Sequence, residues 1–372
     1  MRDIYYAIIG ISLSILYIFY VILERLLINY YRKKIPLIIH VNGIRGKSTT
    51  TRLIDAGLRN CGLKVFSKTT GTIPTMINSN NEDVVIKRLG KANIREQIKM
   101  LKKAAKENVD VLVLECMAVN PELQKICEEK ILTANISIIT NVRMDHIKDM
   151  GDTLEDLAEA LSNTTPTSGK LIVNDSQFNT LFLNKAQKKN SQCIVAKAYN
   201  GIEDLDTFKD NIAIALEVAR QLNLNEQAFF EGMRNYHKDI GAYSEYKKEN
   251  TILLNGLSIN DPDSIKIAYD KVISKYDLNN LTILLNSRSD RPTRVTQHLN
   301  MLSQLKCKKI ILMGSATSYL VKKIKQEINV EVEIFKDFES LLNEQVIFAI
   351  GNIGGDGMKV VDYFKKEGEK LC

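Results

Sequence analysis

The chain has 372 residues, 45% hydrophobic and 26% charged, and its 51 basic and 44 acidic residues leave a net charge of +7. This is ordinary globular usage, which excludes a disordered, collagen-like or disulfide-stapled chain, and at about 150 residues per domain the length predicts two to three domains. The six cysteines show no CxxC spacing, which argues against a zinc ribbon, and the modest charge suits an acidic ligand better than a nucleic acid, so no nucleic-acid partner is expected.

The first residues predict a membrane anchor. No charged residue occurs from Ile4 to Leu23, and a helix of that length, at about 1.5 Å per residue, spans the roughly 30 Å of one hydrocarbon core. Basic residues follow the run at Arg25 and at 32–34. The positive-inside rule therefore predicts a single-pass protein of the cell membrane with its later domains in the cytoplasm. A cleaved signal peptide is the alternative, weakened because the charge follows the run and no small-residue cleavage site appears.

From Pro36 onward, short apolar runs alternate with amphipathic segments, which predicts βαβ units and a mostly parallel sheet. The expected strands are 37–41, 64–66, 111–114, 136–140, 171–173, 252–254, 282–285, 310–313 and 346–350. The expected helices cover 93–107, 153–163 and 206–231, and others begin at Asp263, Thr293 and Ser318. The polar stretch 236–250 marks the best boundary, so the predicted fold class is α/β: an anchor over 1–35, a central domain over 36–240 and a smaller Rossmann-like α/β domain over 241–372.

The strongest motif, HVNGIRGKSTT at 40–50, lies between the first expected strand and a helix. A phosphate-binding loop needs glycines that let amides face an anion, a helix N-terminus, a lysine for the β- and γ-phosphates and a hydroxyl for Mg²⁺. Gly46, Lys47 and Ser48 provide these, although Val41 stands where the common pattern has its first glycine. A helix that merely starts with Ser48 as its cap is the alternative.

Two further motifs also follow strands. Glu115 ends the apolar run 111–114, so it would enter the crevice at the carboxyl ends of the strands and hold Mg²⁺ directly or through water. Asp145 and His146 follow the strand at 136–140 and would reach the same crevice, where we favour a metal or phosphate role for His146. The alternatives are a carboxylate that caps the next helix and a structural histidine.

The second half contributes two weaker candidates. The stretch 255–264 follows a strand and caps a helix, and 286–294 holds three arginines within seven positions. Such arginines form bidentate contacts with carboxylates or phosphates, with a solvated charge cluster as the alternative.

In order, these motifs resemble the Mur ligase superfamily, and within it the CapB/PgsB subunits of poly-γ-glutamate synthase, which make a capsule polymer. The Mur-type loop likewise lacks the first glycine. The segments that carry the resemblance are NGIRGKST at 42–49, KTTGT at 68–72, ECMAVNP at 115–121, NVxxDH at 141–146 and RxDR at 288–291. The N-terminal apolar segment resembles the same branch.

The resemblance implies a Mur-ligase-like central domain that binds ATP and a C-terminal ligase domain. Such enzymes use ATP and Mg²⁺ to activate a carboxylate as an acyl phosphate, which an amine attacks to form an amide. The implied ATP-binding residues are Asn42, Gly43, Ile44, Arg45, Gly46, Lys47, Ser48, Thr49 and Asn260. The implied metal ligands are Ser48, Glu115 and His146, the implied catalytic residues are Lys47, Glu115 and His146, and the implied substrate-binding residues are Thr70, Arg288, Asp290 and Arg291.

The implied partners are glutamate, the poly-γ-glutamate chain, membrane subunits of the CapC/PgsC and CapA/PgsA types, and further copies in a homo-oligomer or hetero-complex. The sequence departs from the family pattern in four places: 158–166 has no lysine to carbamoylate, Asn260 replaces a histidine, 241–244 lacks the expected arginine, and 73–76 replaces the usual DARM. Two alternatives therefore stay open, a soluble-type Mur relative such as folylpolyglutamate synthase and a membrane-tethered ATP-binding assembly subunit without ligase activity.

Overall fold

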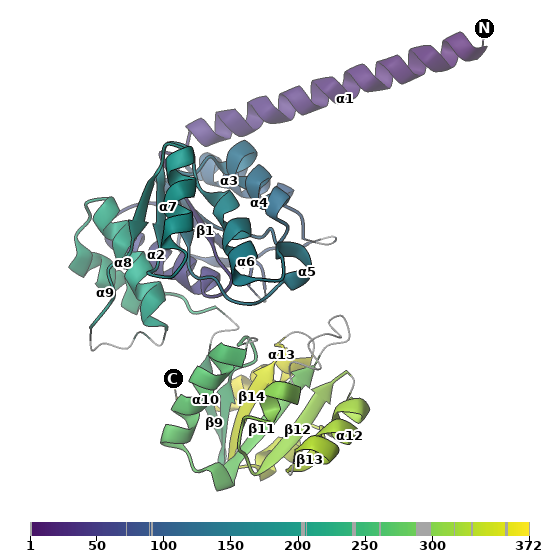
Figure 1. The fold of residues 1–372 in the computed structure, drawn as a ribbon, viewed down its shortest axis with the longest axis vertical. Helices are drawn as coiled ribbons and strands as arrows, with labels where there is room; N and C mark the ends of the chain where they lie inside the picture. The colour runs from purple at the N-terminus through teal and green to yellow at the C-terminus, as the bar shows by residue number, and fades with distance from the viewer. Residues whose placement is uncertain are drawn as a thin grey trace. The chain divides into compact units, whose positions relative to one another are not determined.

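The computed structural model describes residues 2–371 apart from 72, 89, 91, 202–204, 206, 240–242, 260–261, 288–298, 316, 329, 354 and 355. The chain divides into two compact units, Met1–Lys238 and Asp239–Cys372 (Figure 1). Each unit is a sheet with helices on both faces, so the predicted α/β class is confirmed. The helix expected from Thr293 begins outside the described residues.

The first unit holds most of the predicted site residues. Its strands are β1 Leu37–Asn42, β2 Val65–Thr69, β3 Thr75–Ile77, β4 Asp83–Val85, β5 Val111–Glu115, β6 Ile136–Ile139, β7 Lys170–Val173 and β8 Gln192–Val195. Its helices are α1 Arg2–Lys33, α2 Lys47–Asn60, α3 Arg95–Glu107, α4 Pro121–Ile126, the π-helix η1 Cys127–Leu132, α5 Ile147–Met150, α6 Leu154–Leu161, the 3₁₀-helix η2 Ser162–Thr164, α7 Asn179–Lys188, α8 Lys209–Gln221 and α9 Glu226–Arg234.

The sheet of the first unit runs β4-β3-β2-β5-β1-β6-β7-β8 and is parallel except at β3 and β4. Alternate residues of its buried strands face opposite layers, as the twofold period of a strand requires. Ile39 and Val41 of β1 pack with α2, α8 and α9, whereas Ile38 packs with α3 and η1. The connection that follows β1 runs to β2 on one side of the sheet, whereas the connection that follows the neighbouring strand β5 runs to β6 on the other side. Such a switch point opens a crevice at the strand ends.

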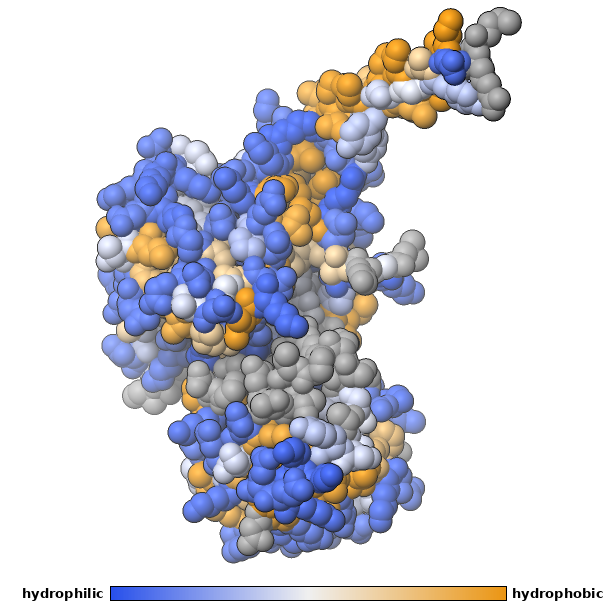
Figure 2. All heavy atoms as spheres, turned by 45° about the vertical axis from the view of Figure 1, so that its right-hand side comes forward, coloured by the Kyte–Doolittle hydropathy of each residue, from blue (hydrophilic) through white to orange (hydrophobic). Residues whose placement is uncertain are grey.

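Helix α1 is one unbroken helix that projects from the first unit (Figure 1). Residues 3–33 are long and apolar enough to cross a membrane, and none of their most apolar stretch is buried. Figure 2 shows hydrophobic side chains along the projecting part, in contrast to the mostly hydrophilic surface of the units. Its last turns differ, because Ile28 lies buried in the core that α3 and η1 form.

The second unit is a smaller α/β layer structure. Its strands are β9 Ser244–Lys248, β10 Thr251–Asn255, β11 Leu281–Ser287, β12 Lys309–Gly314, β13 Glu331–Ile334, β14 Val346–Gly351 and β15 Glu369–Lys370. Its helices are α10 Pro262–Lys275, the 3₁₀-helices η3 Leu278–Asn280 and η4 Glu339–Asn343, α12 Thr317–Glu327 and α13 Asp356–Glu367.

The sheet order in the second unit is β13-β12-β11-β14-β10-β9-β15, with β9 antiparallel to both neighbours. The division between the two units, between Lys238 and Asp239, lies within the polar stretch 236–250. The same stretch also contains β9, whose Tyr246 is buried under α13 while the polar side chains around it hide the strand pattern.

Candidate functional site

The loop between β1 and α2 has the shape that the motif predicts. Gly43 and Gly46 adopt φ of +128° and +79°, in the region that favours glycine. Helix α2 then starts at Lys47 with no side chain capping its first amides. Those amides lack partners within the helix, so together with the helix dipole they could hold an anion such as phosphate.

The opposite rim of this loop is pinned by the segment after β6. Asn141 accepts a hydrogen bond from the amide of Arg45 at 3.0 Å and donates one to the Arg45 carbonyl at 3.0 Å. Thr140 donates its hydroxyl to the same carbonyl at 2.6 Å. Thr140 and Asn141, which lie 95 and 96 residues further along the chain, therefore both fix the loop at Arg45.

The ammonium of Lys47 lies across the loop. Its Nζ donates to the carbonyls of Gly43 and Ile44 at 2.7 and 3.2 Å. Burial lowers the pKa of Lys47 below its ordinary value, and the carboxylates of Glu115 and Asp145 oppose that shift. A polyphosphate held by the loop would place negative charge beside the buried ammonium of Lys47 and so stabilise its charged form.

Glu115 and Ser48 meet at the end of β5. The Ser48 hydroxyl donates to Glu115 Oε2 at 2.7 Å, and the amide and hydroxyl of Thr70 donate to the two Glu115 oxygens at 2.6 and 2.5 Å. Glu115 is only 3% exposed. A buried carboxylate and a hydroxyl side by side are the hard oxygen ligands that Mg²⁺ prefers, so these two residues fit a divalent cation at the phosphate loop.

Asp145 and His146 lie on the Arg45 side of the loop. The Arg45 guanidinium pairs with Asp145 at 2.9 Å, and His146 Nε2 lies 3.9 Å from the same carboxylate. His146 has a φ of +54°, and its amide donates a hydrogen bond to Oδ1 of Asp145 at 2.8 Å. Within the described ranges, no three His, Cys, Asp or Glu side chains converge as a protein-only metal cage would require. The structure thus brings Ser48, Glu115 and Thr70 together and places His146 beside Asp145.

A buried ion-pair network lies next to β5, the strand that ends at Glu115. Lys68, whose side chain is fully buried, lies 2.8 Å from Glu96, which also receives two hydrogen bonds from Arg88 at 2.7 and 2.9 Å. Gln97 donates to the Glu115 carbonyl at 2.9 Å. Burial alone would raise the pKa of Glu96, but the hydrogen bonds from Arg88 and Lys68 outweigh it and lower that pKa to about 2.

The remaining predicted residues are placed as follows. Asn42 donates to Gln124 Oε1 at 2.8 Å and to Thr164 at 3.2 Å beneath the loop, and Ile44 is buried. Thr49 lies in the first turn of α2. Asn260, Arg288, Asp290 and Arg291 lie outside the described residues.

Three residues that shape the site are not predicted from the sequence: Asn211, Thr140 and Gln97. A Cβ on Gly46 would lie 2.5 Å from Oδ1 of Asn211 on α8, so that helix closes over the loop. Thr140 and Gln97 likewise act through long-range contacts. Thr140 carries a detectable signal, a polar side chain at the end of a strand, whereas no local pattern marks Gln97 and Asn211, which lie on helices.

Two family descriptions match the chain. "Mur ligase middle domain" matches residues 41–226, and "Poly-gamma-glutamate synthase CapB C-terminal domain" matches residues 240–367. Among curated proteins, the chain is 33% identical over 353 residues to "PGA synthase CapB" of Bacillus subtilis strain 168, covering 88% of this chain and 90% of that protein. It is also 33% identical over 360 residues to "Capsule biosynthesis protein CapB" of Bacillus anthracis, covering 90% and 77%.

Solved structures of low sequence identity share the fold. The Escherichia coli protein FolC in complex with DHPP and ADP has a TM-score of 0.67 at 13% identity, covering 92% of this chain and 93% of that one. A folylpolyglutamate synthase/dihydrofolate synthase of Yersinia pestis complexed with AMPPNP and Mn has a TM-score of 0.65 at 15% identity, with coverages of 88% and 90%. MurF of Acinetobacter baumannii has a TM-score of 0.68 at 14% identity, with coverages of 92% and 79%.

Proposed function

Since the chain belongs to the Mur ligase superfamily and, within it, to the family of CapB poly-γ-glutamate synthases, we propose that it joins glutamate units through amide bonds at the expense of ATP. The chain is a ligase of this family. The observation that most directly supports the proposal is the pairing of an uncapped loop–helix junction at Gly43–Lys47 with the Ser48–Glu115 oxygen pair. That arrangement suits a triphosphate and its divalent cation.

The proposed reaction runs through an acyl phosphate. A glutamyl carboxylate takes the γ-phosphoryl group of ATP, releasing ADP, and the amine of another unit then displaces phosphate to form the amide. Mg²⁺, held by Ser48 and Glu115, would neutralise phosphate charge. Lys47 would leave the Gly43 and Ile44 carbonyls to bind the transferring phosphoryl oxygens, and the loop amides would orient them.

Several finer assignments belong to the same proposal. His146 would join the metal or phosphate shell, and Asn260 would contact the nucleotide from the second unit. Thr70, Arg288, Asp290 and Arg291 would bind the anionic glutamate chain. Residues 1–35 would span the cell membrane with both catalytic units, 36–240 and 241–372, in the cytoplasm, where CapC/PgsC-type and CapA/PgsA-type subunits would receive the polymer.

The deciding experiment measures glutamate-dependent ADP release and polymer length with membranes that contain the full chain. We expect Lys47→Ala to lower ADP release by at least about a hundredfold, because the variant lacks the cation that neutralises the transferring phosphoryl group. Lys188→Ala, at the exposed end of α7, removes a like charge away from the loop and should behave as wild type. A Lys47→Ala protein that elongates polymer at the normal rate would overturn the proposal.

The same assay separates the two other candidates. ADP release that requires a folate in addition to glutamate would indicate a folylpolyglutamate synthase, whose fold this chain shares. ATP binding without glutamate-dependent release would indicate an assembly subunit without ligase activity.

A further inference from the structure

The docked end of α1 is locked to the first unit by side chains from α1 itself. Arg32 donates to the Thr133 carbonyl at 3.0 Å and to Asn135 Oδ1 at 2.9 Å. Ile28 is 6% exposed and lies in the same core cluster as Met100 of α3. The C-terminal part of α1 is therefore fixed to the first unit by both packing and hydrogen bonds.

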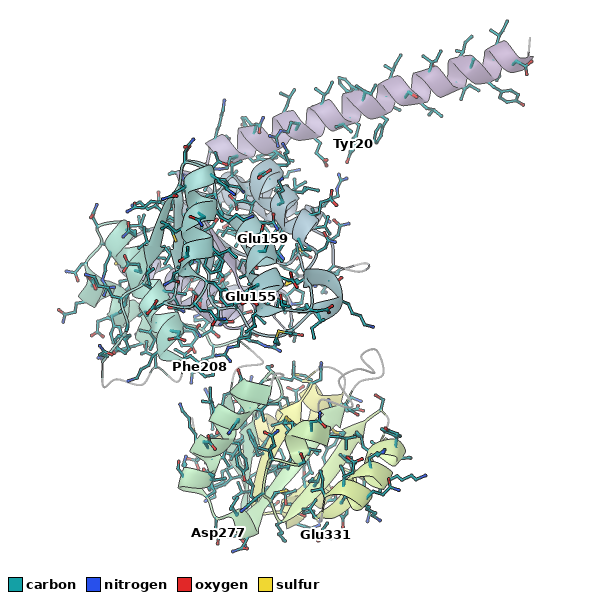
Figure 3. The ribbon with its side chains drawn as sticks, viewed as in Figure 1. Tyr20, Glu155, Glu159, Phe208, Asp277 and Glu331 are labelled. Carbon is teal, nitrogen blue, oxygen red and sulfur yellow. The ribbon has the colours of Figure 1, made fainter. Side chains whose placement is uncertain are left out.

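The apolar run of α1 meets the unit at the start of α3. Arg95, the first residue of α3, donates to the hydroxyl of Tyr20 and pairs with Glu24 (Figure 3 labels Tyr20). Tyr20 belongs to the uncharged run 4–23, and Glu24 is the first charged residue after it. The first turn of α3 is thus held at the level where α1 would leave the hydrocarbon core.

Helix α3 presents a row of cations on its outer face. Lys99, Lys102 and Lys106, here called the α3 lysine stripe, are all exposed. Together with Arg95 they fall within a sector of about 60° at roughly 100° per residue. The opposite face buries Met100, Leu101 and Ala104 in the core. In the part of the chain that the structure describes, no carboxylate forms an ion pair with the stripe.

The stripe starts close to the expected membrane surface. At about 1.5 Å per residue, Lys99 and Lys102 lie at most roughly 6 and 10 Å along α3 from Arg95, and Lys106 at most roughly 17 Å. The headgroup layer adds about 5–8 Å beyond the hydrocarbon core, and charges are felt over about another 8 Å at physiological salt. Lys99 and Lys102 are therefore within reach of an anionic headgroup whichever way α3 points.

We infer that the α3 lysine stripe binds the anionic headgroups of the bilayer that α1 enters, so that the first unit is held against the membrane surface. The inference rests on the proposed insertion of α1. Each lysine near an anionic surface contributes about fivefold to association, so Lys99 and Lys102 together contribute roughly 25-fold. The anionic polymer is the competing occupant, and lipid is favoured because the stripe begins about one helical turn after Arg95, the residue that binds the end of the apolar run.

The test is lysine footprinting of the full chain in nanodiscs. A soluble acylating reagent modifies exposed amines, and mass spectrometry gives the rate at each lysine in discs of neutral lipid and in discs with about a third phosphatidylglycerol. We expect the rates at the stripe to fall several-fold in the anionic discs and to recover at high salt. Lys188, Lys197 and Lys209 are exposed near the other edge of the sheet and should react equally in both.

A variant pair makes the result specific. Replacing Lys99, Lys102 and Lys106 with Glu should abolish the lipid-dependent protection of Lys103, an exposed neighbour on α3 that remains as reporter. The same charge change at Lys188, Lys197 and Lys209 should leave that protection intact.

Two outcomes would overturn the inference. One is equal stripe reactivity in neutral and anionic discs although the chain co-elutes with both, a result that leaves the proposed ligase activity untouched. The other is protection by added poly-γ-glutamate in neutral discs together with no effect of anionic lipid, which would assign the stripe to the polymer. If the wild-type chain showed no glutamate-dependent ADP release, that result would contradict the proposed function and would leave the lipid inference unaffected.

Discussion

At the residue scale, the phosphate loop depends on a close approach that only glycine permits. A Cβ on Gly43 would lie 2.0 Å from the Thr140 hydroxyl and 2.8 Å from its amide, and the φ of +128° adds strain. Thr140 is the residue that pins the Arg45 carbonyl. The loop and the segment after β6 therefore cannot separate to admit a side chain without disturbing the anion site.

Gly43→Ala is expected to lower nucleotide affinity by at least about tenfold and to destabilise the protein by about 2–4 kcal/mol, the sum of backbone strain and overpacking. Isothermal titration with a non-hydrolysable ATP analogue and urea unfolding measure the two effects. Gly62→Ala is the matched control, because Gly62 has a φ of +84° but nothing within 4 Å of its Cβ. It should lose only about 1–2 kcal/mol, with unchanged nucleotide affinity. Equal affinity losses in both variants would contradict the steric explanation.

Local pattern predicted part of this site and could not predict the rest. Gly46, Lys47 and Ser48 stand out because a glycine, a lysine and a hydroxyl in sequence carry the chemistry themselves, and Glu115 stands out as a charge that ends an apolar strand. The hydrogen bonds of Ser48 and Thr70 to Glu115 depend on the order of β2, β5 and β1 in the sheet, which no local spacing encodes. The roles assigned to all of these residues, to His146 and to the residues of the second unit stay predictions.

At the scale of elements, a buried ion-pair network joins β2 to α3. Lys68 of β2 and Glu96 of α3 lie 2.8 Å apart and are almost fully buried, and Arg88 completes the network from the connecting segment. Breaking one member of such a network leaves a buried charge without its partner. The network therefore couples the position of α3 to the strand end that carries Thr70.

This network predicts a pH dependence of stability. The folded pKa of Glu96, about 2, is below its ordinary value of 4.5, so the folded state binds the proton less tightly. Its stabilisation is complete above about pH 4.5 and is lost as the pH falls toward 2, with an upper limit of about 3 kcal/mol. Glu96→Gln should lower stability at neutral pH by about 1–3 kcal/mol and remove this part of the acid sensitivity.

Urea unfolding at pH 6.5 and pH 3.5 measures the effect. The difference between the two values should be smaller in Glu96→Gln than in wild type. Glu155→Gln, an exposed carboxylate on α6 (Figure 3), is the control and should keep the wild-type difference. An unchanged pH dependence in the Glu96 variant would show that the network does not govern acid stability.

The elements also differ in how well the sequence predicts them. Strands β1, β5 and β6 are buried on both faces, so their continuous apolar runs identify them. Strands β3 and β4 have three residues each, too few to leave a pattern, and β4 forms the exposed edge of the sheet. No sequence pattern predicts these two strands, and β3 is defined by its antiparallel pairing with β2, in which Ser67 lies opposite Ile77.

At the scale of the whole molecule, the two units have separate cores. Apolar clusters around β1 and β5 belong to the first unit, and those around β11 and β14 belong to the second. Each core is enclosed by its own helices. Ligand binding to the loop of one unit therefore stabilises that unit directly.

The expected result is a unit-specific effect of nucleotide on unfolding. A Mg²⁺ complex of an ATP analogue at about a hundredfold excess over its Kd should stabilise the first unit by about 2.7 kcal/mol. Hydrogen exchange in urea, read by mass spectrometry on peptides from each unit, measures the shift. Lys47→Ala should abolish it, and Lys188→Ala should preserve it. The second unit, which the proposal links to the nucleotide through Asn260 alone, should shift less, and a shift of equal size would contradict this expectation.

The unbroken course of α1 has a geometric consequence. The helix runs without interruption from the apolar stretch to Ile28, which is buried in the core, and to Arg32, which is hydrogen-bonded to the first unit. The apolar stretch and the first unit must therefore rotate together about the helix axis. One residue inserted near Leu23 would turn the apolar stretch by about 100° relative to the unit, whereas four would return it to within about 40° of its original phase. A membrane partner that contacts both α1 and the first unit would tolerate the four-residue insertion better than the single-residue insertion. Helix α1 therefore fixes the rotation of the first unit about the helix axis as well as its point of attachment.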